Sequence, residues 1–212
     1  MNALTGIYGI LPSALATEEL LAKAEAALQG GLPILQFRDT QSGFKNSLKR
    51  ARLLSGLCAT YGATFIINDS LQMALESGAQ GVHMGREDVG DISTIRNGVP
   101  DDFIVGITCR ADAYFSKSAL QYGANYVSFG AVFPSKTKSD VPVIGLPRLE
   151  KAKAMFPEAK VCAIGGINMD NLNDVKATGA EMAAVISSLF VGDEASIKQT
   201  AEWMVKTWAT NP

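Results

Sequence analysis

Residues able to bind metal ions and phosphates follow several short apolar runs of the chain. Arg38 ends one run, where an unpaired cation is costly, so we expect it either to bind phosphate in a bidentate manner or to pair with Asp39 or a neighbouring carboxylate. Asp69 and Asp88 follow two other runs, and each is expected to be a metal ligand or a helix cap. Two carboxylates with few other ligands suit Mg²⁺, which usually completes its shell with water and substrate phosphate.

His83 is the only histidine of the chain and lies at the end of an apolar run. Such a histidine is either a core residue bonded to a backbone carbonyl, or a polar wall of a substrate pocket or a proton carrier. No cluster of His and Cys indicates zinc, and no Gly-x-Ser-x-Gly segment indicates a serine hydrolase.

Two further segments are typical of phosphate binding. Residues 130–140 combine hydroxyls with two lysines, which suits either a lid over anionic oxygens or a merely solvated loop. Gly165-Gly166 lets a phosphate approach the backbone, and Ile186-Ser187 lies at the end of the next apolar run. Arg38, Asp69 and Asp88 would then form a metal-assisted diphosphate site, and Gly166 and Ser187 a monophosphate site. A pocket with both sites indicates group transfer more than hydrolysis.

Eight apolar runs precede these residues and are too short and too continuous to be amphipathic helices. Their character predicts strands buried on both faces, as in a parallel sheet. The runs are Ile7–Leu11, Ile34–Phe37, Thr64–Ile67, Gly81–Met84, Phe103–Ile107, Tyr126–Phe129, Lys160–Ile164 and Met182–Ile186.

Segments with helical spacing separate these runs. Thr17 is the expected N-cap of the first of them. The predicted helices are Thr17–Gln29, Leu48–Tyr61, Leu71–Ser77, Asp91–Asn97 (the weakest), Ala111–Tyr122, Leu146–Phe156, Met169–Thr178 and Ala195–Trp208.

The alternation predicts an α/β protein, either a closed barrel or a doubly wound sheet. The count of eight and four helix-ending Gly-Ala pairs favour a single (β/α)8 TIM barrel domain over residues 1–212. No Gly-x-Gly-x-x-Gly loop follows the first run, as a nucleotide-binding sheet would require. The active site is then expected at the carboxyl ends of the strands.

Composition excludes several classes of partner. The chain has 212 residues, 47% of them hydrophobic, and a net charge of −2, so nothing indicates a nucleic acid or an anionic membrane surface. No leader or membrane-spanning run is visible, and three scattered cysteines suit a reducing cytoplasm. Trp203 and Trp208 are expected to pack the last helix onto the barrel or to lie in a subunit contact, which leaves a homo-oligomer open.

Taken in order, these segments resemble the thiamine-phosphate synthase (thiamine-phosphate pyrophosphorylase) family. The resemblance extends from Ile7-Tyr8 to Val185-Ile186-Ser187, and its most specific parts are residues 65–69, 81–88, 129–138 and 163–167. It implies that the protein joins 4-amino-2-methyl-5-hydroxymethylpyrimidine diphosphate to a thiazole phosphate, with Mg²⁺ as cofactor and pyrophosphate as the second product.

The resemblance also implies roles for individual residues. Mg²⁺ would be held by Asp69 and Asp88, the diphosphate by Arg38, Asn68 and Lys138, and the pyrimidine by Gln36 and His83. The thiazole phosphate would bind Ser135, Thr137, Gly166 and Ser187, with Gly165 and Ile186 as further substrate-binding residues. Thr108 would lie near the reacting centre, so that Arg38, Thr108 and Lys138 are the expected catalytic residues.

Three departures separate the chain from the family pattern. Thr40 stands where the family usually has a lysine, Leu11-Pro12 where it has Thr-Asp, and Thr108-Cys109-Arg110 where it has Ser-Thr-His. The lost lysine removes one positive charge from the diphosphate site, for which Lys45, Arg86 or Arg110 are the candidate replacements.

Two other functions stay open at this point. One is a thiazole tautomerase-like isomerase, which resembles the synthase but uses a histidine after the fifth strand, where this chain has Arg110. The other is a non-catalytic protein that binds thiazole or thiamine phosphates, which Thr40 and Pro12 favour.

Overall fold

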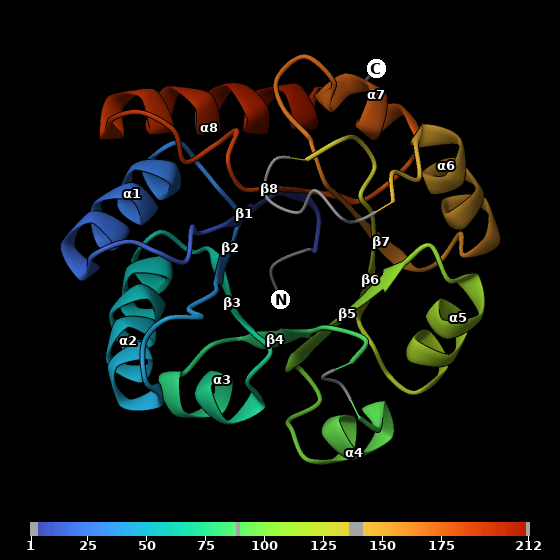
Figure 1. The fold of residues 1–212 in the computed structure, drawn as a ribbon, viewed down its shortest axis with the longest axis horizontal. Helices are drawn as coiled ribbons and strands as arrows, with labels where there is room; N and C mark the ends of the chain where they lie inside the picture. Colours follow the sequence, from blue (N-terminus) through green and yellow to red (C-terminus); the bar gives the residue numbers. More distant parts are fainter. Residues whose placement is uncertain (1–3, 88–89, 136–141, 211–212) are drawn as a thin grey trace.

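The computed structural model of the chain describes residues 4–87, 90–135 and 142–210. Its strands pair in parallel, in chain order, into a closed barrel (Figure 1). They are β1 Gly6–Ile10, β2 Ile34–Phe37, β3 Thr64–Asn68, β4 Gly81–Met84, β5 Ile104–Arg110, β6 Tyr126–Phe129, β7 Lys160–Ile164 and β8 Met182–Val185. The predicted (β/α)8 barrel is therefore confirmed.

The helices form a ring outside the strands (Figure 1). They are α1 Thr17–Gln29, α2 Phe44–Thr60, α3 Leu71–Ser77, α4 Ile92–Asn97, α5 Ala113–Gln121, α6 Leu146–Met155, α7 Leu172–Ala177 and α8 Glu194–Ala209. The prediction that Thr17 caps α1 is wrong, because Ala16 occupies the N-cap position and no side chain bonds there. Side-chain caps are found instead at Ser70, Asp91, Asp112 and Asp193.

Alternation along the strands produces two buried layers. One set of side chains packs between the strands and the helices, and a smaller set fills the barrel interior: Tyr8, Ile10, Ile34, Ile66, Tyr126, Cys162, Met182 and Ala184. All three cysteines are buried and free, as expected of small hydrophobes. Trp208 is partly buried against the core, whereas Trp203 is 37% exposed.

The ends of four helices and of strand β5 bear on the sequence predictions. The four Gly-Ala stops are confirmed, since Gly62, Gly78, Gly123 and Gly179 all adopt positive φ. Strand β5 continues three residues beyond its predicted end at Ile107, because Thr108 and Arg110 also pair with β6. The pairing shifts register between Thr108 and Arg110, and the apolar pattern of the sequence does not predict this irregularity. Within the described residues no helix is long and apolar enough to cross a membrane.

Candidate active site

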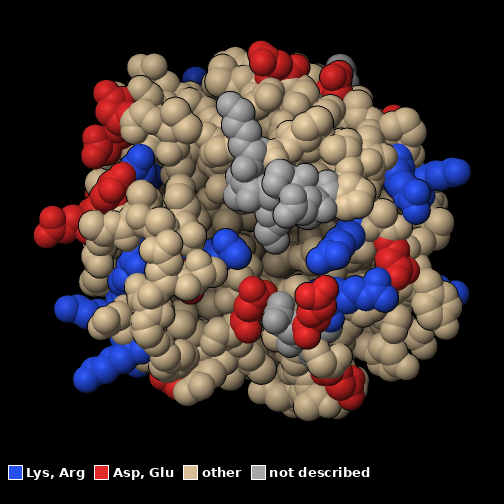
Figure 2. Space-filling view, viewed as in Figure 1, with Lys and Arg blue, Asp and Glu red and all other residues tan. Residues whose placement is uncertain are grey.

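A cavity of about 660 Å³ opens at the carboxyl ends of the strands. Figure 2 shows this face of the barrel, with basic and acidic side chains gathered around a central hollow. Eleven of the predicted site residues line the cavity: Gln36, Arg38, Asn68, Asp69, His83, Thr108, Ser135, Gly165, Gly166, Ile186 and Ser187. Three others, Asp88, Thr137 and Lys138, lie outside the described residues.

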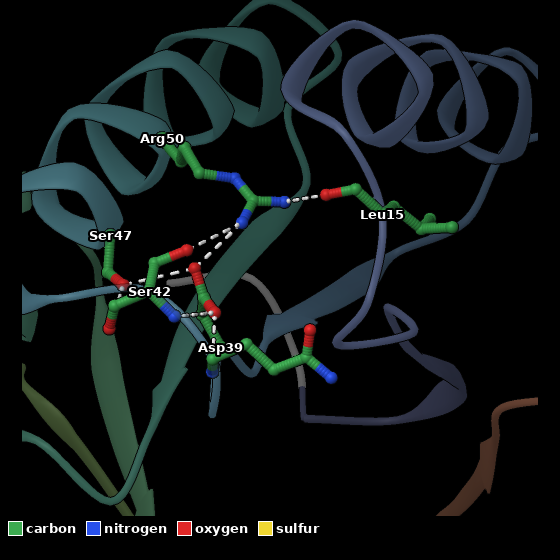
Figure 3. A network of polar contacts seen from close by, with 6 residues as sticks. Leu15, Asp39, Ser42, Ser47 and Arg50 are labelled. Carbon is green, nitrogen blue, oxygen red and sulfur yellow. Dashed lines mark hydrogen bonds and ion pairs between the residues drawn. The ribbon is translucent and has the colours of Figure 1, made fainter.

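Asp39 organises the loop that carries Arg38. Its carboxylate accepts hydrogen bonds from the backbone N–H groups of Gln41 and Ser42, both at 3.1 Å, and from the Ser47 hydroxyl at 3.0 Å. Nη1 of Arg50 lies 2.7 Å from Oδ2 of Asp39 (Figure 3). These contacts fold residues 39–42 into a turn tied to α2, next to Arg38.

Arg50 also ties this turn to the loop after β1. Its second nitrogen, Nη2, donates to the carbonyl of Leu15 at 2.7 Å (Figure 3), and its guanidinium lies 5.6 Å from the centre of the Phe37 ring. Burial would raise the pKa of Asp39, but the hydrogen bonds from the Gln41 and Ser42 backbone and from nearby hydroxyls outweigh it and hold this pKa below its ordinary value. Arg50 and Asp39 thus form a buried pair behind the pocket wall.

This arrangement bears on the two expected roles of Arg38. The alternative of an Arg38–Asp39 ion pair is wrong, because Asp39 pairs with Arg50. None of the ion pairs among the described residues includes Arg38, which is half-buried and lines the cavity. Its guanidinium is therefore placed to meet an anionic ligand.

Asp69 is held in an unusual backbone conformation at the end of β3. Its φ is 60°, which is uncommon for a residue with a side chain. Oδ1 accepts from the Gly85 backbone at 3.1 Å, and Oδ2 accepts from the Asn68 side chain. Ser70, not Asp69, caps α3, so the capping alternative for Asp69 is wrong. The carboxylate is exposed in the cavity, and its oxygens suit a hard cation such as Mg²⁺.

A chain of side-chain hydrogen bonds lies under the cavity floor. Gln36 Nε2 donates to the Tyr8 hydroxyl at 2.7 Å, and this hydroxyl is 2.9 Å from that of Tyr126. His83 follows, with Nδ1 2.9 Å from the Tyr126 hydroxyl and Nε2 2.8 Å from Oγ1 of Thr108. The imidazole thus belongs to a polar network and also lines the cavity.

The two tyrosines of this network were missed by sequence reasoning. Both lie inside apolar runs, Tyr8 in β1 and Tyr126 in β6, where their rings are indistinguishable from core side chains. The only sequence signal is Gly106, whose Cβ would lie 2.0 Å from the Tyr126 ring, but its meaning depends on the fold. Near Thr108, burial raises the pKa of Cys109 to about 11, so its thiol stays protonated and is a poor nucleophile.

The opposite side of the cavity consists largely of backbone. Gly165 and Gly166 have φ values of 103° and 65°, and a Cβ on Gly166 would lie 2.4 Å from the carbonyl oxygen of Pro134. Among the described residues, the N–H groups of Gly166, Ser187 and Ser188 donate to no other protein atom. Backbone donors around a close-approach glycine are what a phosphate requires.

Two arginines on the rim bear on the missing lysine. Thr40 is exposed and is not part of the cavity wall, and Lys45 faces a separate groove along α2. Arg86 and Arg110 do line the cavity. Arg86 is paired with Asp112 at 2.7 Å, whereas Arg110 is only 3.6 Å from the exposed carboxylate of Glu87. Arg110 therefore has the weaker ion pair of the two, and its charge is the more available to a ligand.

These features define a class of protein: a (β/α)8-barrel enzyme whose site lies at the carboxyl ends of its strands, with charged side chains on one side and phosphate-type backbone donors on the other. Residues 7–189 match the family model for thiamine monophosphate synthase. The chain belongs to the thiamine-phosphate synthase family.

Individual relatives agree with this assignment. The chain is 42% identical over 188 residues to the thiamine-phosphate synthase of Thioalkalivibrio sulfidiphilus, covering 88% of each chain. It is 40% identical over 200 residues to that of Chromobacterium violaceum, covering 93% of this chain and 95% of the relative. The structure of thiamine phosphate pyrophosphorylase from Pyrococcus furiosus superposes with a TM-score of 0.84 and 29% identity, over 96% and 95% of the two chains.

Proposed function

We propose that this protein joins 4-amino-2-methyl-5-hydroxymethylpyrimidine diphosphate to a thiazole phosphate, forming thiamine phosphate and releasing pyrophosphate. The observation that carries the proposal is one cavity with two unlike sides. Arg38 and Asp69 lie on one side, and Gly166 and Ser187 on the other. A metal-bound diphosphate suits the first side and a monophosphate suits the second.

The proposal includes Mg²⁺ as cofactor. Asp69 would hold the ion together with Asp88, which lies outside the described residues, and with oxygens of the diphosphate. The described residues form no group of three or more metal-binding side chains, so the ion would keep much of its shell as water and substrate oxygen. When bound, it would neutralise charge on the departing diphosphate.

The remaining chemistry is one of alignment. The C–O bond between the pyrimidine methylene and the diphosphate breaks, its electron pair leaves with the diphosphate, and the thiazole nitrogen then forms the new C–N bond. Arg38, Asn68 and Lys138 would stabilise the charge that develops on the diphosphate. Gln36 and His83 would orient the pyrimidine. No proton has to be removed in these steps, so the site needs no strong base.

The wider setting of the enzyme is also inferred. We expect residues 1–212 to form one domain, to act in the cytoplasm on small-molecule substrates, and to involve neither nucleic acid nor membrane. The three buried free cysteines support a reducing compartment. The 37% exposure of Trp203 on α8 keeps a homo-oligomer among the outcomes to test by sedimentation.

A direct assay tests the proposal. Purified protein is incubated with both substrates and Mg²⁺, and thiamine phosphate and pyrophosphate are followed together. Equal amounts of both products are expected, and none above an Asp69→Ala control would overturn the proposal. Incubation with the non-aromatic thiazole tautomer is the second arm. No isomerisation is expected, because His83, the only histidine, belongs to the cavity floor and not to the loop after β5.

A further inference from the structure

The hydrogen bonds under the cavity floor form an unbroken series across the barrel. In order, they join the side chains of Gln36, Tyr8, Tyr126, His83 and Thr108 at 2.7, 2.9, 2.9 and 2.8 Å. These residues come from β2, β1, β6, β4 and β5. Gln36 and Thr108, at the two ends, both line the cavity, so the series connects two separate points of its wall.

Burial limits where the protons of this series reside. Tyr8 is 1% exposed and Tyr126 is fully buried, and burial raises the pKa of both phenols. Each hydroxyl therefore carries one proton and can donate one hydrogen bond. Gly106 leaves the space that the Tyr126 ring occupies, since a Cβ there would lie 2.0 Å from that ring. The position of the central hydroxyl is thus built into the barrel.

Counting donors gives the series a direction. Gln36 donates to Tyr8 through Nε2, so the Tyr8 proton must go to the oxygen of Tyr126 and the Tyr126 proton to Nδ1 of His83. In this direction a neutral imidazole carries its proton on Nε2 and donates it to Oγ1 of Thr108, which also accepts from the Ser128 hydroxyl at 3.5 Å. Reversing one bond alone would leave a buried donor without an acceptor, so the bonds reverse together or not at all.

The same direction corresponds to one orientation of the Gln36 amide. One N–H of its nitrogen is engaged by Tyr8, and its carbonyl oxygen is the acceptor left for a ligand. We propose that Tyr8, Tyr126 and His83 are positioning residues that hold the Gln36 amide with its oxygen toward the cavity, which makes the site accept an amino-bearing pyrimidine and reject its 4-oxo counterpart. The proposal rests on the proposed function for the identity of the ligand.

The selectivity follows from hydrogen-bond complementarity. An exocyclic amino group donates to the Gln36 oxygen, whereas a 4-oxo group would place two acceptors against each other. A site arranged to bond a polar group of its ligand discriminates strongly against an analogue that cannot make the bond. Rotation of the amide would relieve the clash, but only if every bond of the series and the tautomer of His83 reversed with it.

The single histidine makes the direction measurable without any activity. In protein labelled with ¹⁵N at histidine, every imidazole signal belongs to His83. We expect the signals of a neutral ring protonated at Nε2, with Nδ1 accepting a hydrogen bond. A ring protonated at Nδ1 would overturn the proposal. Tyr8→Phe should leave these signals unchanged, because Tyr126 can still donate to Nδ1.

Selectivity is tested by the ratio of two dissociation constants, measured by calorimetry without thiazole phosphate. The ligands are the 4-amino pyrimidine diphosphate and its 4-oxo analogue, each with Mg²⁺. The wild-type protein should prefer the amino compound by at least about 100-fold. Tyr126→Phe and Tyr8→Phe should each lower this preference about tenfold or more, whereas Tyr114→Phe, at an 87% exposed surface position, should not change it.

The outcomes separate failure of this proposal from failure of the proposed function. If either floor variant weakens both ligands equally, the hydroxyls are merely structural and the proposal is overturned. If Tyr126→Phe does not fold, Tyr8→Phe still decides, because it must lower selectivity while the imidazole signals stay constant. If the wild-type protein binds neither diphosphate, the proposed function fails, but the ¹⁵N measurement still establishes whether the series has the inferred direction.

Discussion

The two sides of the cavity are built from different parts of the polypeptide. The side-chain wall, at the ends of β2 to β5, presents Gln36, Arg38, Asn68, Asp69, His83 and Thr108. The backbone cup, after β7 and β8, presents Gly165, Gly166, Ser187 and Ser188. The wall depends on contacts behind it, such as Arg50 with Asp39, whereas the cup depends on the absence of a Cβ.

This difference predicts two kinds of sensitivity. Changes at Arg38 or Asp69 should alter one interaction at a time, since each has its own supporting contacts. Gln36, His83 and Thr108 share one series of hydrogen bonds and should respond together. A change in the cup should displace the backbone itself, because the Cβ of residue 166 would meet main-chain atoms that cannot rotate away. Each side should affect the KM of one substrate. Changes in the wall should alter the KM for the pyrimidine diphosphate, and changes in the cup should alter the KM for the thiazole phosphate.

Asp69→Asn should have the largest effect on the wall. It removes the charge of the proposed metal ligand while keeping the size of the side chain, so kcat/KM should fall about 10³-fold. Steady-state assays at increasing Mg²⁺ concentration measure kcat/KM of the variant, which should recover partly at high Mg²⁺. Asp101→Asn, at an exposed turn before β5, is the matched control. Full activity of Asp69→Asn at low Mg²⁺ would remove Asp69 from the metal site.

Gly166→Ala should be the most damaging change in the cup. The residue has a φ of 65°, and the new Cβ would lie 2.4 Å from the Pro134 carbonyl. We expect KM for thiazole phosphate to rise about 100-fold while KM for the pyrimidine diphosphate changes little, since a displaced backbone donor costs about 1–3 kcal/mol.

Gly62→Ala separates strain from steric clash. Gly62 has a similar φ of 67°, but no atom lies within 4 Å of its Cβ position. This variant should lose about 1 kcal/mol of unfolding free energy with both KM values unchanged. Equal KM increases for the two substrates in Gly166→Ala would contradict the separation of wall and cup.

Arg50→Met tests the support behind the wall. Arg50 and Asp39 are a buried pair with side chains 10% and 1% exposed, and loss of one partner from such a pair costs about 3–5 kcal/mol of unfolding free energy. Because the turn after Arg38 is loosened, KM for the pyrimidine diphosphate should also rise about tenfold. Arg52→Met, on the same helix, should leave both quantities close to wild type. A stable variant with an unchanged KM would show that the pair does not position Arg38.

The hydrogen bonds to Asp39 should also make stability depend on pH. The pKa of Asp39 is lowered in the folded protein, so its contribution is complete above the unfolded pKa of about 3.9 and is lost as the pH falls through the lower folded value. Urea unfolding of wild type and Asp39→Asn should therefore differ most at pH 7 and converge toward pH 2. A constant difference over this range would mean that Asp39 does not titrate as the hydrogen bonds require.

The sequence predicted the strands better than the supports of the site. Eight apolar runs correspond to eight strands, because burial on both faces leaves a local pattern that a single chain displays. The contacts of Arg50 with Leu15, 35 residues away, and of Tyr8 with Tyr126, 118 residues away, leave no such pattern. The residues that line the cavity were thus partly predictable from strand ends, while those that hold them in place required the three-dimensional structure.

Thr40→Lys should produce the smallest change and concerns the charge of the wall. Thr40 is exposed and outside the cavity wall, while Arg86 and Arg110 already line it. Because Arg110 is held only loosely by Glu87, at 3.6 Å, it can supply the charge that the family usually takes from lysine. We therefore expect less than about a threefold gain in kcat/KM in Thr40→Lys. Arg110→Gln should lower kcat/KM about tenfold, and the added lysine should then restore most of the loss. A large gain from Thr40→Lys alone would instead identify the natural chain as a weakened enzyme, with a wall that lacks one cation.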